Sequence, residues 1–328
     1  MKIIVTGGDG FIGYHLCKAL VARGDLVYVV DRMAEVKRLG AGVVGSAFAN
    51  QWEANVGGRS PMRVIRARYE DTDRWGENAR GADAVVHLAG QTNLSEIGSD
   101  VREFQSTGVN VSGLCEFMHK TLIPRLVFAS SAAVYGLGGT DEKEALYPIN
   151  TYGHAKAIAE QIIRGYAEWC GGWWKARVLR FFNVYGPDPW PHRHDVISQF
   201  VEAARYERPM RVFVPDKTHQ YYRDFVHVDD VVKAILWAIT ADVGVYQAYN
   251  VCAGDSYNIG TVAKRIQKWG AERGYDWEVT MVEHPDGRQV GSSFGLVGKL
   301  DRGMNGAWKP IDLKTGLADL LAGAFPKT

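Results

Sequence analysis

Tyr152 and Lys156 stand four residues apart in the stretch NTYGHAK, a spacing that places both side chains on one face of a helix. A tyrosine with an ordinary pKa of about 10 is a poor base at neutral pH, and a nearby ammonium lowers that pKa by stabilising the phenolate. The pair is therefore a candidate for acid–base chemistry on a hydroxyl group. Many surface helices contain the same spacing, so the interpretation needs support from the rest of the chain.

A glycine-rich turn, TGGDGFIG, follows the first apolar segment and opens a predicted helix. Small residues here let the backbone approach a pyrophosphate, and the helix N-terminus adds unpaired N–H groups and a favourable dipole. The context indicates a dinucleotide site, with a tight turn that binds nothing as the alternative. The predicted cofactor contacts in the turn are Gly7, Gly10, Phe11, Ile12 and Gly13.

Asp31 ends the second predicted strand. A carboxylate at this position can accept hydrogen bonds from an adenosine ribose and repels a 2′-phosphate, which favours NAD over NADP. Arg32 stands beside it and could offset part of that preference. We therefore predict NAD as the cofactor, with Asp31 and Arg32 in its site.

Ser131 lies at the carboxyl end of the fifth predicted strand, and Tyr152 follows it by the length of one loop. Ligands bind at this edge of parallel α/β sheets. Beside a nicotinamide, Tyr152 would exchange the proton of a substrate hydroxyl while Ser131 hydrogen-bonds the same oxygen. Lys156 would lower the pKa of the tyrosine and bond the nicotinamide ribose. The alternatives are that Ser130 supplies the hydroxyl, or that Ser131 only caps the strand end.

The elements that must position these residues alternate in type along the chain. Apolar segments alternate with helical patterns, including a helix closed by Gly24 and a long helical pattern that ends near residue 120. This alternation predicts an α/β fold with a doubly wound parallel sheet of the Rossmann type. The predicted strands lie at 2–8, 26–31, 62–71, 82–90, 125–136 and 175–186.

The sequence changes in texture near residue 183, where shorter elements and a segment rich in Pro and His begin. We predict a NAD-binding Rossmann domain over residues 1–182 and a smaller C-terminal α/β lobe over 183–328, with 224–250 returning to the first domain. The segment RDFVHVDDVVKAILWAI predicts a helix start that is capped by its adjacent aspartates.

Composition is typical of a soluble globular protein, with 328 residues, 46% apolar residues and a net charge of +1. Balanced charge gives no reason to expect nucleic acid or a membrane as a partner, and no apolar run is long enough to span a bilayer. Four widely spaced cysteines in apolar segments predict buried free thiols and a cytoplasmic protein. His192 and His194 lack a nearby third ligand, so no metal site is predicted.

Seven motifs occur in the order in which the extended short-chain dehydrogenase/reductases have them. They are TGGDGFIG (6–13), HLAG (87–90), NVSG (110–113), SSAAVYG (130–136), YGHAK (152–156), RFFNVYGP (180–187) and RDFVHVDDV (223–231). The chain resembles the nucleotide-sugar epimerase/dehydratase group of that family, and most closely its NAD-dependent 4-epimerases. The resemblance implies tightly held NAD, a nucleoside-diphosphate sugar in the C-terminal lobe, and a homodimer formed through helices around 100–119 and 152–169.

The resemblance also assigns residues to both ligands. It implies that Arg223 lies near the diphosphate, and an arginine fork also suits phosphate oxygens. The implied NAD contacts are Leu88, Ala89, Gly90, Asn110, Tyr152 and Lys156, and the implied substrate contacts are Ser131, Tyr135, Asn183, Arg223 and Arg288.

Two alanines distinguish the predicted reaction from others in the group. Relatives that eliminate water have Asp and Glu where this chain has Ala132 and Ala133, and a methyl group cannot move a proton. The remaining chemistry needs Ser131, Tyr152 and NAD, which predicts C4 epimerisation of a UDP-hexose or UDP-N-acetylhexosamine through a 4-keto sugar. An ADP-heptose-type 6-epimerase, a keto-sugar reductase or dehydratase, and a non-catalytic NAD-binding protein stay open as alternatives.

Three positions depart from the pattern of these relatives. Arg68 stands where they have an Asp that contacts adenine, which leaves Asp71 and Asp73 as candidate substitutes. Arg193 lies near the second, lysine-type base of the heptose epimerases, and an arginine does not readily give up its proton. Ser293 stands where a bulky residue excludes acetamido sugars in some epimerases, so a serine favours N-acetylhexosamines.

Overall fold

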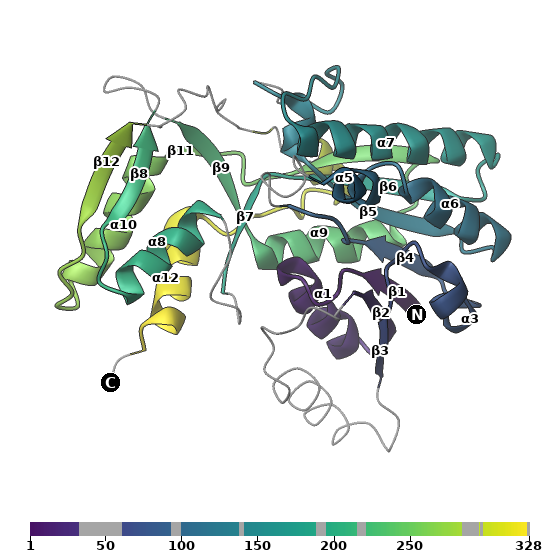
Figure 1. The fold of residues 1–328 in the computed structure, drawn as a ribbon, viewed down its shortest axis with the longest axis horizontal. Helices are drawn as coiled ribbons and strands as arrows, with labels where there is room; N and C mark the ends of the chain where they lie inside the picture. Colours follow the sequence, from purple (N-terminus) through teal and green to yellow (C-terminus); the bar gives the residue numbers. More distant parts are fainter. Residues whose placement is uncertain are drawn as a thin grey trace. The chain divides into compact units, whose positions relative to one another are not determined.

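The structure, a computed structural model, describes residues 1–32, 61–92, 100–137, 141–187, 195–214, 221–283, 295 and 298–326 (Figure 1). Tertiary contacts divide the chain into two compact units. Unit 1 consists of Met1–Ala129, Ala155–Leu179 and Ile235–Gln247. Unit 2 consists of Ser130–His154, Arg180–Ala234 and Ala248–Thr328.

The main sheet contains seven strands in the order β10-β6-β5-β4-β1-β2-β3. They are β1 (Lys2–Thr6), β2 (Leu26–Asp31), β3 (Met62–Arg66), β4 (Ala84–His87), β5 (Arg125–Ser131), β6 (Lys175–Phe181) and β10 (Tyr246–Val251). Strand β1 pairs in parallel with both β2 and β4, so the strand order reverses between β1 and β4. Doubly wound sheets bind ligands at such a reversal, outside the carboxyl ends of the strands. The sheet confirms the predicted fold class.

Apolar residues fill β1 and β2, whose central side chains are almost fully buried. Helix α1 (Phe11–Ala22) buries Leu16, Cys17 and Leu20 and packs against both strands. As predicted, a glycine closes the helix: Gly24 has φ +88°, which residues with a Cβ rarely adopt. Figure 1 shows α6 (Val111–Lys120) and α7 (Thr151–Trp169) on the face of the sheet opposite α1, as right-handed crossovers require.

The long helical pattern that ends near residue 120 contains two helices rather than one. Helix α5 (Val101–Thr107) ends at Gly108, and α6 begins three residues later. A Cβ on Gly108 would lie 2.8 Å from the Ala155 carbonyl oxygen, so the chain passes close to α7 at a point where only glycine fits. A single continuous helix is therefore wrong, because hydrophobic periodicity does not report where another helix approaches.

Unit 2 contains two small sheets. A three-stranded sheet has the order β11-β9-β7, and β8 pairs in parallel with β12. The strands are β7 (Asn183–Tyr185), β8 (Met210–Val214), β9 (Tyr222–His227), β11 (Ser256–Asn258) and β12 (Val279–Glu283); the helices of this part of the chain are α8 (Val196–Arg205), α9 (Val228–Thr240), α10 (Ile259–Ala271), α11 (Gly298–Gly303) and α12 (Leu313–Ala324). Phe200, Phe225 and Trp277 belong to the apolar core between them.

Two predicted elements differ from the observed ones. The predicted strand over 175–186 is two strands, β6 in the main sheet and β7 in the three-stranded sheet. The segment RDFVH belongs to β9, and helix α9 begins after it. Asp229 and Asp230 lie in the first turn of α9, where negative charge stabilises the helix dipole. The Asp230 carboxylate also accepts a hydrogen bond from the Ile311 N–H at 2.7 Å, which ties α9 to the chain before α12.

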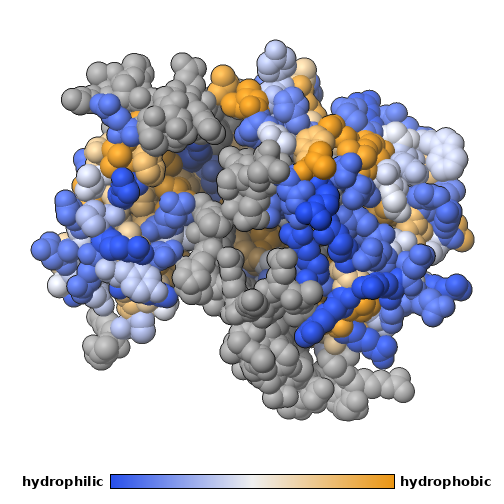
Figure 2. Space-filling model, viewed as in Figure 1, coloured by the Kyte–Doolittle hydropathy of each residue, from blue (hydrophilic) through white to orange (hydrophobic). Residues whose placement is uncertain are grey.

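All four cysteines are free and buried, as predicted. Among the described residues, every helix falls short of the length or apolar character needed to cross a bilayer. The same part of the chain holds no group of three His, Cys, Asp or Glu residues arranged for a metal ion. The face shown in Figure 2 is mostly hydrophilic, with scattered hydrophobic patches. His192, Arg193, His194, Arg288 and Ser293 lie outside the described residues.

Candidate active site

A pocket in unit 1 lies where β1, β2 and β4 end. It contains seven of the predicted cofactor contacts, which come from the glycine turn, the end of β2 and the HLAG motif. These are Gly7, Gly10, Asp31, Arg32, Leu88, Ala89 and Gly90. Six predicted contacts do not line this pocket: Phe11, Ile12, Gly13, Asn110, Tyr152 and Lys156.

The three glycines of the turn differ in what requires them. A Cβ on Gly7 would lie 2.6 Å from the Ala89 nitrogen, and one on Gly13 would lie 2.3 Å from the Gly7 carbonyl oxygen, so packing excludes side chains at both positions. Gly10 has an ordinary φ of −74°, and a Cβ there would meet only the Gly7 oxygen, at 3.2 Å. Its missing side chain leaves space in the pocket beside the start of α1, which fits a ligand that lies against the backbone.

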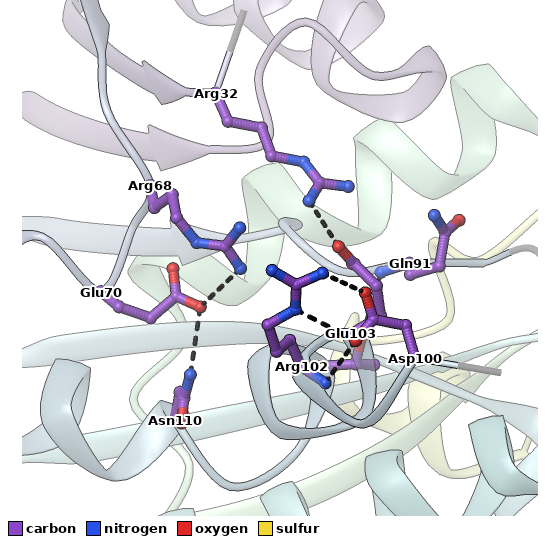
Figure 3. Close-up of polar contacts among 9 residues, drawn as sticks. Arg32, Arg68, Glu70, Gln91, Asp100, Arg102, Glu103 and Asn110 are labelled. Carbon is purple, nitrogen blue, oxygen red and sulfur yellow. Dashed lines mark hydrogen bonds and ion pairs between the residues drawn. The ribbon is translucent and has the colours of Figure 1, made fainter. Parts of the chain in front are cut away.

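Two pairs of oppositely charged side chains line this pocket (Figure 3). Arg32 donates to Glu103 at 2.7 Å, and Arg68 lies 3.4 Å from Glu70. The Asn110 amide donates to Glu70 at 3.2 Å, so Asn110 supports a pocket residue without lining the pocket. Burial raises the pKa of Glu70, but its hydrogen bonds outweigh that effect and hold the pKa below its ordinary value.

Arg68 and Glu70 line the pocket, whereas the two aspartates that the sequence suggested as adenine contacts do not. Asp71 precedes α3 (Thr72–Ala79) and Asp73 lies in its first turn, and neither lines the pocket. The sequence did not identify Glu70 because it lies in a short turn after β3. In such a turn, a shift of one position changes which side chain faces the pocket.

Asp9 is a second residue that sequence reasoning missed, although it is the only charged residue within the glycine turn. The Asp9 N–H donates to the Asp31 carboxylate at 2.9 Å, and both side chains line the pocket. Burial and the charge of Asp31 raise the pKa of Asp9 to about 6. Burial also raises the pKa of Asp31, against the effect of hydrogen bonds from the Asp9 and Arg32 N–H groups.

Lys156 lies beside the same pocket. Its ammonium donates to the Ala129 carbonyl oxygen at 2.8 Å and lies 4.9 Å from the centre of the Phe128 ring. A Cβ on Gly90 would be 3.3 Å from the Lys156 Nζ, so the ammonium is next to a pocket residue. The side chain is 3% exposed, and burial lowers the pKa of Lys156 to about 8.

Tyr152 and Ser131 meet in unit 2, where a hydrogen bond joins their side chains. The Asn150 side chain accepts from the Gly153 N–H at 2.8 Å and thereby caps the start of α7. A Cβ on Gly153 would lie 2.5 Å from the Ala133 carbonyl oxygen, so the start of α7 packs directly on the turn after β5. Ser131 also accepts from the Ala133 N–H at 3.1 Å, so it caps this turn as well as contacting Tyr152.

The predicted effect of Lys156 on Tyr152 is wrong for the protein alone. Burial raises the pKa of Tyr152 to about 12, and the hydrogen bond from Ser131 offsets only part of this rise. The spacing of four residues places both side chains on α7 as predicted. The sequence could not reveal how strongly the surrounding protein removes the phenol from water.

Three predicted substrate contacts, Tyr135, Asn183 and Arg223, are hydrogen-bonded to other residues of unit 2. The Tyr135 hydroxyl donates to Asn250 at 2.7 Å and accepts from Arg180 at 2.8 Å, so this buried group is held on both sides by protein. The Asn183 amide donates to the Asp224 carbonyl oxygen at 2.9 Å. Arg223 lies on β9, next to Asp224, and donates to the Tyr222 carbonyl oxygen.

The Asp224 side chain adds further hydrogen bonds to the backbone of unit 2. Its two carboxylate oxygens accept from the Ala253 N–H at 2.8 Å and the Gly254 N–H at 2.9 Å, and its side chain is fully buried. Burial raises the pKa of Asp224 to about 6, although the backbone N–H groups oppose this rise.

We expect Asp224→Ala to lower the free energy of unfolding by about 2 to 5 kcal/mol, because two backbone N–H groups lose hydrogen bonds to a fully buried carboxylate. Urea denaturation measures this loss, with the exposed Asp255→Ala in the same loop as a control. The folded protein binds the Asp224 proton more tightly than the unfolded chain does. The stability difference between wild type and variant should therefore shrink as the pH rises from about 4 to about 6. A loss below 1 kcal/mol would contradict this role.

Comparison with known proteins agrees with the geometry of the pocket. The model of the NAD dependent epimerase/dehydratase family matches residues 3–260, which include the glycine turn, Ser131, Tyr152 and Lys156. The chain belongs to the NAD dependent epimerase/dehydratase family. This membership confirms the predicted resemblance and NAD as the cofactor, and it makes the protein an NAD-dependent enzyme of this family.

Relatives within the family match most of the chain. A UDP-glucose 4-epimerase from Erwinia amylovora is 28% identical over 294 residues, which is 82% of each chain. The crystal structure of UDP-glucose 4-epimerase from Thermotoga maritima with UDP-glucose has a TM-score of 0.81 at 26% identity and covers 98% of this chain and 97% of its own. That of the Thermus thermophilus UDP-glucose 4-epimerase with NAD has a TM-score of 0.80 at 26% identity, with 99% of each chain covered.

Proposed function

We propose that this family member is a nucleotide-sugar epimerase that inverts C4 of a UDP-hexose or UDP-N-acetylhexosamine through a transient 4-keto sugar. The observation that carries the proposal is the hydrogen bond between Ser131 and Tyr152, with Ala132 and Ala133 in the adjoining turn. This arrangement can move the proton of one hydroxyl, and it places no carboxylate at the two positions that follow Ser131.

The proposed reaction uses the phenol of Tyr152 twice. As hydride leaves C4, Tyr152 takes the proton of the C4 hydroxyl; after the ketone turns over, hydride returns to the opposite face and Tyr152 gives the proton back. Ser131 hydrogen-bonds the sugar oxygen in both steps. When bound, NAD would accept and return the hydride, and its cationic ring would lower the pKa of Tyr152 from its high value.

The choice of UDP-sugars is supported by the relatives, whose names specify UDP-glucose 4-epimerases. Within the proposal, residues 1–182 together with 224–250 bind NAD and residues 183–328 bind the sugar nucleotide. Asn183, Arg223 and Arg288 are the proposed substrate contacts, with Tyr135 in a supporting position because its hydroxyl already bonds Asn250 and Arg180.

We also propose a cytoplasmic homodimer formed through α5, α6 and α7. Exposed apolar side chains on two of these helices support that assembly: Val101 on α5 is 69% exposed and Ile158 on α7 is 36% exposed. Burying such side chains against a second copy removes apolar surface from water.

The test incubates the purified full chain, without added cofactor, with UDP-glucose, UDP-galactose, UDP-N-acetylglucosamine and UDP-N-acetylgalactosamine in turn. Interconversion of one pair, followed by chromatography of the sugar nucleotides, is the expected result. A stable deoxy-keto product would identify a dehydratase. In a separate arm with added NADH or NADPH and a keto-sugar nucleotide, net oxidation of the added cofactor would identify a keto-sugar reductase instead. An ADP-heptose is the last substrate, and its turnover without that of any UDP-sugar would replace C4 with C6 as the reacting carbon.

A further inference from the structure

The pocket of unit 1 contains more negative than positive side chains. Among its lining residues are four carboxylates, Asp9, Asp31, Glu70 and Glu103, and two guanidinium groups, Arg32 and Arg68. Arg32 pairs with Glu103 and Arg68 pairs with Glu70, as Figure 3 shows. Within the described residues Asp9 and Asp31 form no ion pair, and in that sense they are the two unmatched carboxylates, although the charge of Arg32 lowers the pKa of Asp31.

The two unmatched carboxylates lie side by side because the backbone joins their elements. The glycine turn after β1 delivers the Asp9 N–H to the Asp31 carboxylate at 2.9 Å, so the residue that follows Gly8 is fixed against the end of β2. The proximity is also electrostatic, since the charge of Asp31 raises the pKa of Asp9. Asp9 is therefore part of the same pocket wall as Asp31, although the two residues are far apart in sequence.

We propose that Asp9 is a second determinant of cofactor choice, acting with Asp31 to exclude a dinucleotide that has a 2′-phosphate. A ribose hydroxyl can donate to a carboxylate, whereas a phosphate brings further negative charge and only acceptor oxygens. Placing that phosphate near one carboxylate is unfavourable, and Asp9 adds a second carboxylate on the neighbouring turn. The inference rests on the NAD site and does not depend on the proposed epimerase reaction.

Each arginine of the pocket is paired with a carboxylate, which limits how far it offsets this repulsion. A guanidinium binds a phosphate well when its N–H groups are available, but Arg32 already donates to Glu103 at 2.7 Å. Arg68 is likewise positioned by Glu70, which Asn110 holds in place. Neutralising Asp9 should therefore weaken the exclusion of NADP through charge alone, with the rest of the pocket unchanged.

The test compares full-length wild type with Asp9→Asn, Asp31→Asn and the double variant, because Asn keeps the size of Asp and removes its charge. Each protein is equilibrated with equal concentrations of NAD and NADP and desalted, and the nucleotides released on denaturation are quantified by chromatography. We expect the ratio of bound NADP to bound NAD to rise about tenfold (~1.4 kcal/mol) in Asp9→Asn, and further in the double variant. A higher salt concentration screens the charge of Asp9, so the ratios of bound NADP to bound NAD in wild type and Asp9→Asn should become more similar.

The matched control is Asp73→Asn, which makes the same change in net charge at an exposed position outside the pocket. Its nucleotide ratio should equal that of wild type. A ratio in Asp9→Asn within twofold of wild type would overturn the proposal, and so would an equal loss of both nucleotides, which would mean that Asp9 only shapes the turn. If Asp9→Asn fails to fold by circular dichroism, Asp9→Ser is subject to the same two outcomes. Since no sugar is present, failure here leaves the proposed reaction untouched.

Discussion

Tyr152→Phe is expected to reduce epimerisation about a thousandfold while leaving the amount of bound NAD unchanged. The substitution removes one oxygen from a ring that is held by the Ser131 hydrogen bond and by the packing of α7 on Ala133. A positioned proton-transfer group contributes about 10²- to 10⁴-fold to a rate. The high pKa of Tyr152 in the protein alone means that the phenol keeps its proton until substrate and cofactor are in place.

The measurement is the initial rate of sugar-nucleotide interconversion, together with chromatography of the nucleotide released from the denatured protein. Tyr206→Phe, at an exposed tyrosine after α8, is the matched control and should keep the wild-type rate. Activity above a tenth of wild type in Tyr152→Phe would remove this residue from the proton path. A parallel loss of NAD would instead indicate that the ring holds the cofactor.

The second large effect concerns Gly13 and Gly10, two glycines of the same motif that we expect to have different roles. Gly13→Ala places a Cβ 2.3 Å from the Gly7 carbonyl oxygen and 2.6 Å from the Gly8 Cα. Both contacts are backbone atoms, which cannot move aside as a flexible side chain does. We expect a loss of about 3 kcal/mol or more in the free energy of unfolding, in the upper range for overpacked interiors.

Gly10→Ala should behave in the opposite way. Its backbone conformation suits any residue, and the added methyl meets only one protein atom, at 3.2 Å, so the unfolding free energy should change by less than 1 kcal/mol. The methyl would enter the pocket that Gly10 lines, and NAD affinity should fall by at least about tenfold.

Urea denaturation and a nucleotide-binding titration distinguish the two variants. Gly113→Ala is the control, because a Cβ there meets nothing within 4 Å and alanine favours the helix interior. Equal stability losses in Gly10→Ala and Gly13→Ala would show that both glycines serve packing alone. Unchanged NAD affinity in Gly10→Ala would place the dinucleotide elsewhere.

Local patterns predicted the parts of this protein that depend on local sequence. The glycine turn, the buried strands and the start of α7 follow from residue types within a few positions of each other. The turn and the strand ends bring seven predicted contacts into one pocket. The segments that failed depend on partners distant in sequence. Gly108 breaks a helix because α7 passes close by, and RDFVH is a strand because β9 pairs with β7 and β11.

The same distinction applies to single side chains of the site. The spacing of Tyr152 and Lys156 was enough to place both on α7, but their pKa values are set by burial, which no spacing reports. Asp9 and Glu70 were missed because both face one pocket through contacts distant in sequence, Asp9 with Asp31 and Glu70 with Asn110. A charged residue inside a glycine turn is the one signal that could have identified Asp9.

The four sequestered thiols make the native protein a convenient background for chemical labelling. Burial raises the pKa of each of them, and alkylating reagents attack the thiolate of an accessible cysteine. A single cysteine introduced on the outer face of α10, for example by Thr261→Cys, would then accept a maleimide dye alone. With a second exposed cysteine introduced in the same way, the distance between the two dyes could follow ligand-driven motion without removing any natural cysteine.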